Sequence, residues 1–353
     1  MNPTARVLYV YSESGAPMRY RVQHALEQAD AAGIPALAAH ISQRSGLINL
    51  AGVRLLILHR MPLAPRTLLL IAQARLRGCK IAYESDDLTW DPAIRSYEHL
   101  DQHRDPATIR RILRTVRRTA LLMRRCDALI FSTTYLAQRA ADDFGRPTFT
   151  CLNAVSQAMQ QAAAVLRPAP GDTLLRIGYF SGHAHVHDED LASIGEALAA
   201  LMACYPQICL TLVGEVATPA ALRPWAERIE RRALVPWQQL PAEIARVQIN
   251  LAPLIDNPQR RAKSALKYLE AGLLGIPTIA ADLPPYQEVV RHGETALLAG
   301  TPADWQQLLT HLIEAEDERQ RLGQAARHDI LSNHTTQARA SQYATMIERI
   351  LHP

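Results

Sequence analysis

Lysine is almost missing from this chain of 353 residues. Only three of its 38 basic residues are lysines, and all the others are arginines. Two of the three, Lys263 and Lys267, stand four positions apart, and Glu270 follows three positions later. A chain that otherwise uses arginine for positive charge therefore has two compact ammonium groups in one short stretch.

Features of membrane and secreted proteins are also missing. No apolar run approaches the length of a membrane span. The first predicted strand starts at residue 7, which leaves no room for a signal peptide. The five cysteines are odd in number and scattered, without a C-x-x-C pair. These absences predict a cytoplasmic protein with reduced thiols.

Two nucleotide-binding signatures are absent. The sequence contains neither the dinucleotide fingerprint G-x-G-x-x-G nor the P-loop G-x-x-x-x-G-K-[ST]. A nicotinamide oxidoreductase and a P-loop NTPase are therefore both disfavoured.

The length and pattern of the chain predict two α/β domains. Short β-branched runs alternate with helical patterns in both halves, which is typical of doubly wound parallel sheets. The predicted strands are residues 7–11, 55–59, 81–83, 128–132, 148–152, 177–180, 208–213, 233–235, 249–252, 278–280 and 296–298. We divide the chain into residues 1–168, 169–335 and 336–353. The first division follows from the Pro/Gly-rich stretch 167–173, and the last segment is expected to be a helix that packs toward the first domain.

Positive charge is concentrated in the first half. Residues 1–170 hold 22 Lys/Arg against 13 Asp/Glu, whereas residues 171–353 hold 16 against 21. Much of the excess lies in a predicted amphipathic helix at residues 107–125. Its arginines are Arg110, Arg111, Arg114, Arg117, Arg118, Arg124 and Arg125. The helix is either a solvated surface or a contact for an anionic membrane or acceptor. Nucleic acid is disfavoured, because no aromatic residues are interleaved and no helix-turn-helix or finger pattern occurs.

The stretch around the two lysines predicts an anion site. A helix that starts after residues 257–261 and stops at Gly275-Ile-Pro277 would place Lys263, Lys267 and Glu270 on one face. Helix N-terminal amides beside lysines suit a diphosphate, and a carboxylate two turns along suits a sugar diol. An ordinary surface pattern with a weak Lys267–Glu270 ion pair explains the spacing equally well.

Further motifs of the second half occur in a fixed order. They are Arg176-Ile-Gly-Tyr-Phe-Ser-Gly182, His187-Asp-Glu-Asp190-Leu, Leu212-Val-Gly-Glu215, Ile249-Asn-Leu-Ala-Pro-Leu254, the stretch 263–277 and residues 288–298. Over about residues 174–330 this order resembles the C-terminal donor domain of bacterial retaining glycosyltransferases of the group 1 superfamily (family 4-like). The first half is similar more weakly, at residues 19–22, 82–88 and 132–136. The resemblance implies the GT-B architecture, in which two doubly wound Rossmann-like domains face each other across a cleft.

The resemblance also implies a donor site. In that superfamily a nucleotide sugar lies in the cleft, which assigns Glu270 to the ribose and Lys263 to the diphosphate. The residues expected at the donor are Gly182, His183, His187, Trp237, Lys263, Ser264, Ala265, Lys267 and Glu270. Cations and amides placed in advance would stabilise the departing diphosphate, so neither a metal nor a cofactor is expected.

Two positions depart from the superfamily pattern. A glutamate usual at position 262 is replaced by Ala262, which leaves Asp256 as the nearby carboxylate that could substitute. The usual Arg/Lys pair after the first strand of the domain is replaced by His183, His185 and His187. These histidines could bind phosphate, and their spacing would alternatively suit a metal.

Candidate catalytic residues in the first half follow two predicted strands. Asp86 and Asp87 follow residues 81–83, where they could orient an acceptor hydroxyl or act as its base, together with Lys263 on the donor side. Capping of a following helix explains the two aspartates equally well. His59 ends another strand and is a further candidate, although a histidine at a strand end is often structural.

These observations predict a metal-independent, retaining hexosyl- or deoxyhexosyltransferase. It would move a sugar from a nucleotide diphosphate donor to a glycan, lipid-linked or protein-linked acceptor in surface polysaccharide or glycoconjugate assembly. The expected location is the cytoplasm, with contact between the arginine helix and the inner face of the membrane. The alternatives are a nucleotide-sugar epimerase or hydrolase of the same fold and a non-catalytic nucleotide-sugar-binding protein. A hydride-transfer enzyme is a third, less favoured alternative.

Overall fold

The computed structural model describes residues 6–42, 48–166, 174–182 and 187–352 and divides into two compact units. The first unit comprises Met1–Ala154, Asn257–Ser264 and Thr336–Pro353, and the second comprises Val155–Asp256 and Ala265–Thr335. The division predicted after residue 168 falls in the stretch 167–173, outside the described residues. The structure begins the second unit at Val155 and returns residues 257–264 to the first.

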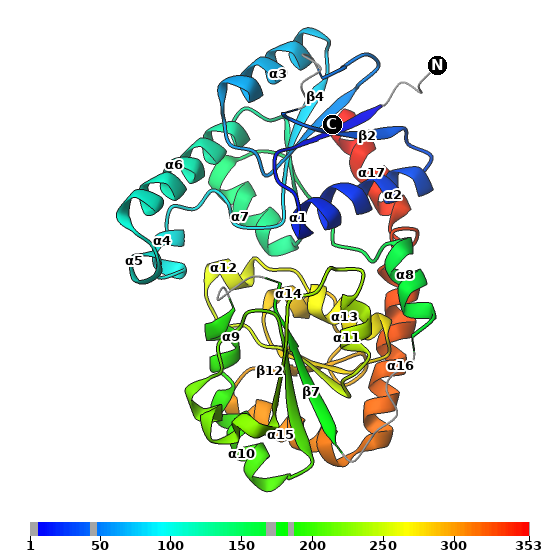
Figure 1. Ribbon diagram of the computed structural model, residues 1–353. Helices are drawn as coiled ribbons and strands as arrows, with labels where there is room; N and C mark the ends of the chain where they lie inside the picture. The colour runs from blue at the N-terminus through cyan, green and yellow to red at the C-terminus, as the bar shows by residue number, and fades with distance from the viewer. Residues whose placement is uncertain (1–5, 43–47, 167–173, 183–186, 353) are drawn as a thin grey trace. The chain divides into compact units, whose positions relative to one another are not determined.

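The first unit is built on a six-stranded parallel sheet of order β2-β1-β3-β4-β5-β6 (Figure 1). Its strands are β1 (Val7–Tyr11), β2 (Ala36–His40), β3 (Leu55–His59), β4 (Lys80–Ser85), β5 (Ala128–Phe131) and β6 (Thr148–Thr150). Its helices are α1 (Ala16–Met18), a π-helix (Arg19–Gln23), α2 (His24–Ala31), α3 (Pro65–Leu76), α4 (Ile94–Tyr97), α5 (Leu100–His103), α6 (Pro106–Met123), α7 (Thr134–Phe144), α12 (Pro258–Arg261) and α17 (Ala340–Leu351).

Both faces of the first sheet are covered, which explains why its central strands β1 and β3 are almost wholly apolar. Leu56 and Leu58 of β3 belong to the apolar cluster that includes residues of α3, α6 and α7. Leu55 and Ile57 alternate with them and belong to a second cluster, formed with α2 and α17. Strand β2, which the sequence analysis does not predict, lies at the edge, and its residues are mostly half-buried.

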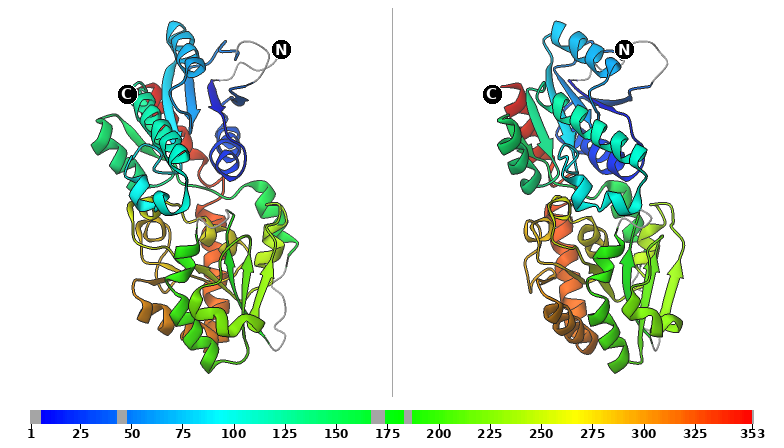
Figure 2. Two further views of the ribbon diagram at one scale, coloured as in Figure 1. Left: turned by 60° about the vertical axis from the view of Figure 1, so that its left-hand side comes forward. Right: turned by 90° about the vertical axis from the view of Figure 1, so that its left-hand side faces the viewer.

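The second unit contains another six-stranded parallel sheet, of order β12-β11-β10-β7-β8-β9. Its strands are β7 (Leu175–Phe180), β8 (Ile208–Val213), β9 (Ile229–Arg232), β10 (Ile249–Ala252), β11 (Thr278–Ala281) and β12 (Leu297–Ala299). Its helices are α8 (Gln157–Ala164), α9 (Asp188–Ala192), α10 (Gly195–Cys204), a 3-10 helix (Ala220–Arg228), α11 (Leu240–Ile244), α13 (Leu266–Leu273), α14 (Pro284–Gln287), α15 (Pro302–Glu314) and α16 (Glu316–Asn333). Within this unit, Figure 2 shows α16 running beside the sheet.

One strand of the second sheet is predicted at the wrong residues. The apolar run 233–235 is irregular, and the strand is β9, whose residues Ile229-Glu-Arg-Arg232 are mostly polar. Strand β9 lies at the sheet edge, where half-buried polar side chains are tolerated. Position in the sheet therefore outweighs apolar content here.

The order of strands reverses once in each sheet. In the first sheet the reversal lies between β1 and β3, and in the second between β7 and β10. Doubly wound sheets bind ligands beyond the carboxyl ends of the strands at such a point. The predicted α/β class with two doubly wound sheets is confirmed. Among the described residues, no helix is long and apolar enough to span a membrane.

Candidate functional site

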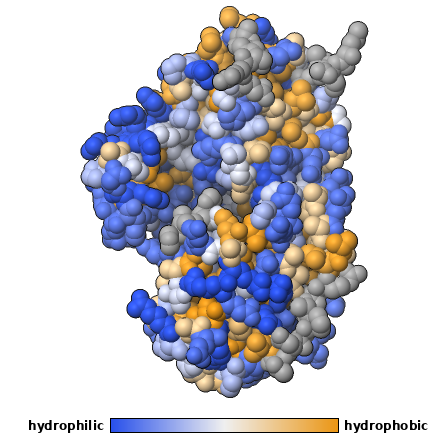
Figure 3. Space-filling model, viewed as in Figure 1, coloured by the Kyte–Doolittle hydropathy of each residue, from blue (hydrophilic) through white to orange (hydrophobic). Residues whose placement is uncertain are grey.

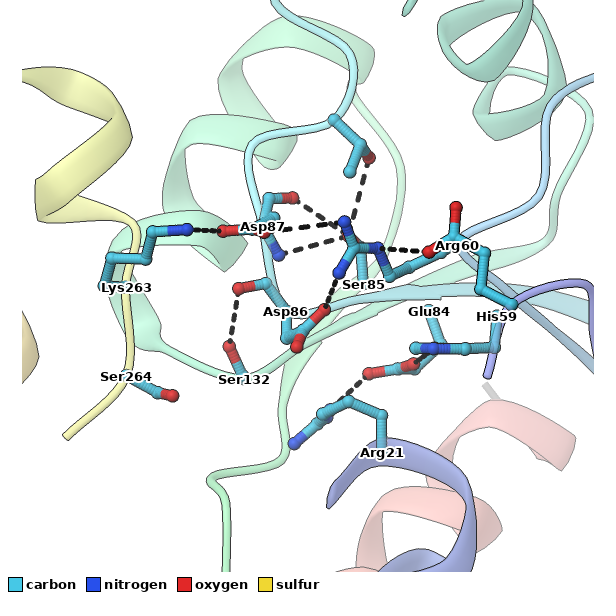
Figure 4. A network of polar contacts seen from close by, with 12 residues as sticks. Arg21, His59, Arg60, Glu84, Ser85, Asp86, Asp87, Ser132, Lys263 and Ser264 are labelled. Carbon is cyan, nitrogen blue, oxygen red and sulfur yellow. Dashed lines mark hydrogen bonds and ion pairs between the residues drawn. The ribbon is translucent and has the colours of Figure 1, made fainter. Parts of the chain in front are cut away.

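Polar side chains gather where three neighbouring strands of the first sheet end (Figure 4). Arg60 directly follows β3, Asp86 and Asp87 directly follow β4, and Ser132 directly follows β5. The Arg60 guanidinium lies 3.3 Å from the Asp86 carboxylate and 3.5 Å from the Asp87 carboxylate. The next helix, α4, begins only at Ile94, so the two aspartates do not cap a helix. The cluster owes its existence to the parallel sheet, which brings these strand ends to one edge.

His59 lies beneath this cluster and is fully buried. Its Nδ1 lies 2.5 Å from Oε2 of Glu84, and the other oxygen of Glu84 accepts from Nε of Arg21 at 2.6 Å. Burial alone would raise the pKa of Glu84, but the charges and hydrogen bonds of Arg21 and His59 hold this pKa below its usual value. His59 is 0% exposed and therefore positions other groups in this structure instead of contacting a substrate.

Glu84 was not identified as a site residue from the sequence. The available signal was a carboxylate directly after the apolar run Ile81-Ala-Tyr83, because an acid buried in a strand needs a cationic partner. Its partner Arg21 comes from the π-helix, a rare form that is frequent at functional sites.

Arg21 extends this network to residues far along the chain. Its guanidinium donates to the Asn153 side-chain oxygen at 2.8 Å, and the Asn153 amide donates to the Ser264 hydroxyl at 2.8 Å. Ser264 is thereby joined to the buried charges at the carboxyl edge of the first sheet.

The predicted helix around Lys263 is interrupted in the structure, and this part of the prediction is wrong. Helix α12 ends at Arg261 and α13 begins at Leu266, with Ala265 in a non-helical conformation (φ −78°, ψ 35°). Lys263 lies in the gap, and its Nζ is 2.6 Å from Oδ1 of Asp87. The predicted stripe fails because tertiary contacts of residues 257–264 outweigh helix propensity, so Lys263 does not share a helical face with Lys267.

Position 262 explains one departure from the superfamily pattern. Ala262 is 0% exposed and belongs to the apolar cluster of the first unit. A glutamate here would place a carboxylate among apolar side chains, which is costly without a partner. Asp256, which could substitute for this glutamate, is exposed on the loop after β10.

Lys267 lies where the strand order of the second sheet reverses, between β7 and β10. Lys267, in the first turn of α13, donates to the carbonyl oxygen of Phe180, the last residue of β7. Its Nζ lies 4.8 Å from the centre of the Tyr179 ring. Burial lowers the pKa of Lys267, while the nearby carboxylates of Glu270 and Asp190 act in the opposite direction. Glu270, one turn further along α13, is half-buried.

Asp190 organises the same edge of the second sheet. It is 0% exposed and accepts from Nδ1 of His187 at 2.7 Å and from the backbone amide of Ile255 at 3.0 Å. It thereby joins the predicted phosphate ligand His187 to the loop that follows β10. His183 and His185 lie outside the described residues. Gly182 follows β7 with open space where a Cβ would lie.

The structure also shows where three further residues of the predicted donor site lie. Ser264 lies in the gap before α13, and Ala265 is the buried N-cap of that helix. Trp237 is half-buried in the turn after β9. In the part of the chain that the structure describes, no group of three or more His, Cys, Asp or Glu could hold a metal ion.

Comparison with known proteins shows that this chain is similar to glycosyltransferases. Residues 194–345 match a family described as glycosyl transferase-like. The chain is also similar to glycosyltransferase 1 domain-containing protein 1 of Xenopus tropicalis, at 23% identity over 180 residues. That match covers 48% of the chain and 52% of the relative, so it spans about half the length of this curated relative.

Solved structures resemble the whole chain. A glycosyltransferase of Rickettsia africae ESF-5 aligns with a TM-score of 0.68 at 12% identity, covering 99% of both chains. Sucrose-phosphate synthase of Thermosynechococcus elongatus aligns with a TM-score of 0.64 at 14% identity, covering 98% of this chain and 99% of that one. Anabaena HepE in complex with UDP aligns with a TM-score of 0.62 at 15% identity, covering 98% and 100%.

The chain has the GT-B fold, and residues 194–345, most of which lie in its second unit, are similar to the glycosyl transferase-like family. The predicted fold of two doubly wound Rossmann-like domains is confirmed, and so is the similarity of the second half to glycosyl transferase-like proteins. In this GT-B protein the family match includes β10, α13 and β11, and so it contains both Lys267 and Glu270.

Proposed function

We propose that this GT-B protein is a retaining glycosyltransferase that uses a uridine diphosphate sugar. One observation supports this function most directly. Lys267 lies at the carboxyl end of β7, at the switch point of the domain that matches the glycosyl transferase-like family, and Glu270 lies one turn further along α13. The similar HepE protein is described in complex with UDP and with UDP-glucose, which favours uridine as the base.

The proposed donor site divides the nucleotide sugar among three groups of residues. Glu270 accepts hydrogen bonds from the ribose hydroxyls, and Trp237 lies against the base. The diphosphate is bound by Lys263, with amides of the segment 264–265 and with the residues Gly182, His183 and His187. Lys267 supports this site from the end of β7. Positive charge that faces the leaving diphosphate stabilises the transition state more than the ground state, so the reaction proceeds without a metal.

The proposed acceptor site lies at the carboxyl edge of the first sheet. Asp86 and Asp87 orient the acceptor hydroxyl, which belongs to a glycan, lipid-linked or protein-linked acceptor in surface polysaccharide or glycoconjugate assembly. Their half-buried carboxylates are 14% and 19% exposed, so a hydroxyl can reach them. His59 acts indirectly, by holding Glu84 beneath them.

A thermal-shift panel tests the donor assignment. UDP, GDP, dTDP and CMP are added to the wild type and to Glu270→Ala and Lys263→Ala. We expect UDP to stabilise the wild type, by about 2.7 kcal/mol at a concentration of 100 Kd. Each variant loses a hydrogen bond to a charged group, worth about 1.5–3 kcal/mol, and should bind UDP about 10- to 100-fold more weakly.

The chain offers matched controls for this panel. Lys80→Ala removes the one lysine that lies outside the proposed donor site, and Glu294→Ala removes a glutamate that is 68% exposed. Both should respond to UDP as the wild type does. Equal shifts in Glu270→Ala, Lys263→Ala and the wild type would contradict the proposed site.

Turnover separates the proposal from its alternatives. A transferase consumes the UDP-sugar only when an acceptor is present and does so equally well in EDTA. Consumption without an acceptor would favour an epimerase or hydrolase of the same fold. Tight UDP binding without turnover of any donor would favour a non-catalytic binding protein.

We further propose that α6 holds the protein at an anionic membrane surface on the cytoplasmic side. No acid occurs within Pro106–Met123, and the helix buries Ile109, Val116 and Leu122 on its other face. Its exposed arginines are Arg110, Arg111, Arg114, Arg117 and Arg118, none of which forms an ion pair with a described residue. Figure 3 shows the region of α4 to α6 as mostly hydrophilic. Clustered exposed arginines without acidic partners are attracted to anionic lipids.

A further inference from the structure

Asp87 is held between two cations at the carboxyl edge of the first sheet (Figure 4). Its Oδ1 lies 2.6 Å from Nζ of Lys263, and its Oδ2 lies 3.5 Å from the guanidinium of Arg60. The side chain of Asp87 is 19% exposed, that of Lys263 is 23% exposed and that of Arg60 is 18% exposed, so solvent reaches all three. A carboxylate held by a lysine and an arginine occupies the kind of position that a phosphate takes in an anion site.

The position of Arg60 in the fold favours ligand binding. Arg60 follows β3, and its Nε lies 3.7 Å from the carboxylate of Glu13, two residues beyond β1. Strands β1 and β3 are the neighbours between which the strand order reverses, which is where doubly wound sheets bind ligands. The Arg60 side chain therefore lies at the switch point of the first sheet.

The backbone of Arg60 supports the same interpretation. Its φ of 48° is in the left-handed region, which is unfavourable for a residue with a Cβ. The Arg60 amide donates to the carbonyl oxygen of Glu84 at 2.9 Å, which fixes this conformation from β4. Strained residues of this kind persist only where the surrounding structure holds them, and they cluster at ligand sites.

The neighbouring ion pairs show why Asp87 can be displaced. The acids Glu84 and Glu98 have buried arginine partners, Arg21 at 4% and Arg260 at 3% exposure. Lys263 and Arg60 are instead held by the partly exposed Asp86 and Asp87. Ion pairs that solvent reaches contribute little to stability. A phosphate group that carries more charge can therefore replace the Asp87 carboxylate.

We propose that Arg60 and Lys263 form an anion site that Asp87 fills when no ligand is bound, and that a phosphate of the donor diphosphate replaces it. The proposal rests on the proposed function, and it adds Arg60 to the phosphate ligands. It also gives Asp87 two states. Before donor binding Asp87 neutralises Lys263, and after donor binding it is released toward the acceptor hydroxyl. Donor binding would thus precede activation of the acceptor.

Calorimetric titration of the full chain with UDP, and with uridine as a probe without phosphate, tests the proposal. Asp87→Asn removes the competing carboxylate, so its Kd for UDP should fall about three- to fivefold, the equivalent of 1 kcal/mol or less. Its Kd for uridine should not change. Arg60→Gln should weaken UDP binding by about tenfold or more and leave uridine binding unchanged, because a charge-assisted hydrogen bond to phosphate is lost.

Asp101→Asn separates a local effect from a general one. It removes a negative charge from the same unit, but Asp101 pairs with Arg95 and with neither Arg60 nor Lys263, so we expect a change in Kd of less than about twofold. Circular dichroism and the melting temperature establish that each variant is folded. If the wild type binds no nucleotide, the proposed function fails. If it binds UDP but Asp87→Asn binds no more tightly, or if Asp101→Asn has the same effect, the anion site is refuted while the proposed function stands.

Discussion

Glu84 stays charged although its side chain is only 1% exposed, because Arg21 and His59 both bind it. Moving a charge from water into the interior of a protein is costly, and this cost is offset only by good geometry on both oxygens. Each Glu84 oxygen has its own nitrogen partner, at 2.6 Å and 2.5 Å. Arg21 and His59 thus fix the end of β4, which Asp86 and Asp87 directly follow.

Loss of this carboxylate should destabilise the first unit severely. In Glu84→Gln the Arg21 charge remains buried without its counter-ion, and we expect the free energy of unfolding to fall by about 3–5 kcal/mol. Hydrogen exchange of the β3 and β4 amides measures this change. Asp101→Asn is the control, because Asp101 is 58% exposed and pairs with exposed Arg95, so the change there should stay below about 1 kcal/mol. A small effect for Glu84→Gln would show that the network contributes little to stability.

Residue types near the site could be selected from the sequence, but their partners could not. Asp86 and Asp87 were predicted from their place after a strand, and the structure locates them at the carboxyl edge. That Lys263 would pair with Asp87 was not predictable, since 176 positions separate the two residues. Sequence spacing describes neighbours within one helix or strand, whereas this pair forms by tertiary packing.

At the scale of single elements, α6 matches its prediction closely. It is predicted at residues 107–125 and observed at Pro106–Met123, with Asp105 as an N-cap that accepts from the amides of Ala107 and Thr108. A long amphipathic pattern with a capping residue and a proline in the first turn is a strong local signal. The same pattern leaves its arginines on the exposed faces.

Vesicle binding tests the role of α6. Replacing Arg110, Arg114 and Arg117 by Gln should reduce partitioning onto vesicles that contain phosphatidylglycerol by about 100-fold, because each arginine near an anionic surface contributes about 1 kcal/mol. The control replaces three exposed arginines of the second unit, Arg223, Arg246 and Arg327.

Two further conditions sharpen this test. Vesicles of neutral phosphatidylcholine should bind the wild type weakly, and about 0.5 M salt should reduce binding to the anionic vesicles through screening. Equal partitioning of the two triple variants would show that α6 is an ordinary solvated helix.

The lysine stretch shows where local patterns fail at this scale. Helical spacing predicted one helix over Lys263 and Glu270, but the structure ends α12 at Arg261 and starts α13 at Leu266. Ala262, Lys263 and Ser264 belong to the first unit and contact its distant segments, and no local sequence signal marks these contacts. Contacts with the rest of the unit outweigh the modest preference of such a sequence for a helix.

At the scale of the whole molecule, the chain passes between its two units four times. It leaves the first unit after Ala154, returns for Asn257–Ser264, and returns finally at Thr336. The last segment forms α17, whose Tyr343, Met346 and Ile347 belong to the apolar cluster of β1, β3 and α2. The first sheet is therefore completed by residues from the end of the sequence.

The contribution of α17 can be measured at its most buried residue. Ile347 is 0% exposed, and Ile347→Ala should lower the free energy of unfolding of the first unit by about 2–5 kcal/mol, from lost burial and the resulting cavity. Thr345→Ala, at an exposed position of the same helix, should change it by less than about 0.5 kcal/mol.

Amide exchange of β1 in the first unit and of β8 in the second reports the two units separately. Ile347→Ala should accelerate exchange in β1 more than in β8. Unchanged protection of β1 would mean that α17 adds little to the stability of the first sheet.

The sequence by itself determined the class of the fold, because apolar strands that alternate with amphipathic helices can bury both faces of a sheet only in a parallel, doubly wound arrangement. It also placed His59 at the end of one strand and Asp86 and Asp87 after another, near the carboxyl edge of the first sheet. Only the tertiary structure decided that Lys263 pairs with Asp87, that Ala262 lies in an apolar cluster and that Glu84 is neutralised by Arg21. Those outcomes depend on the packing of segments far apart in the chain, for which local spacing contains no information.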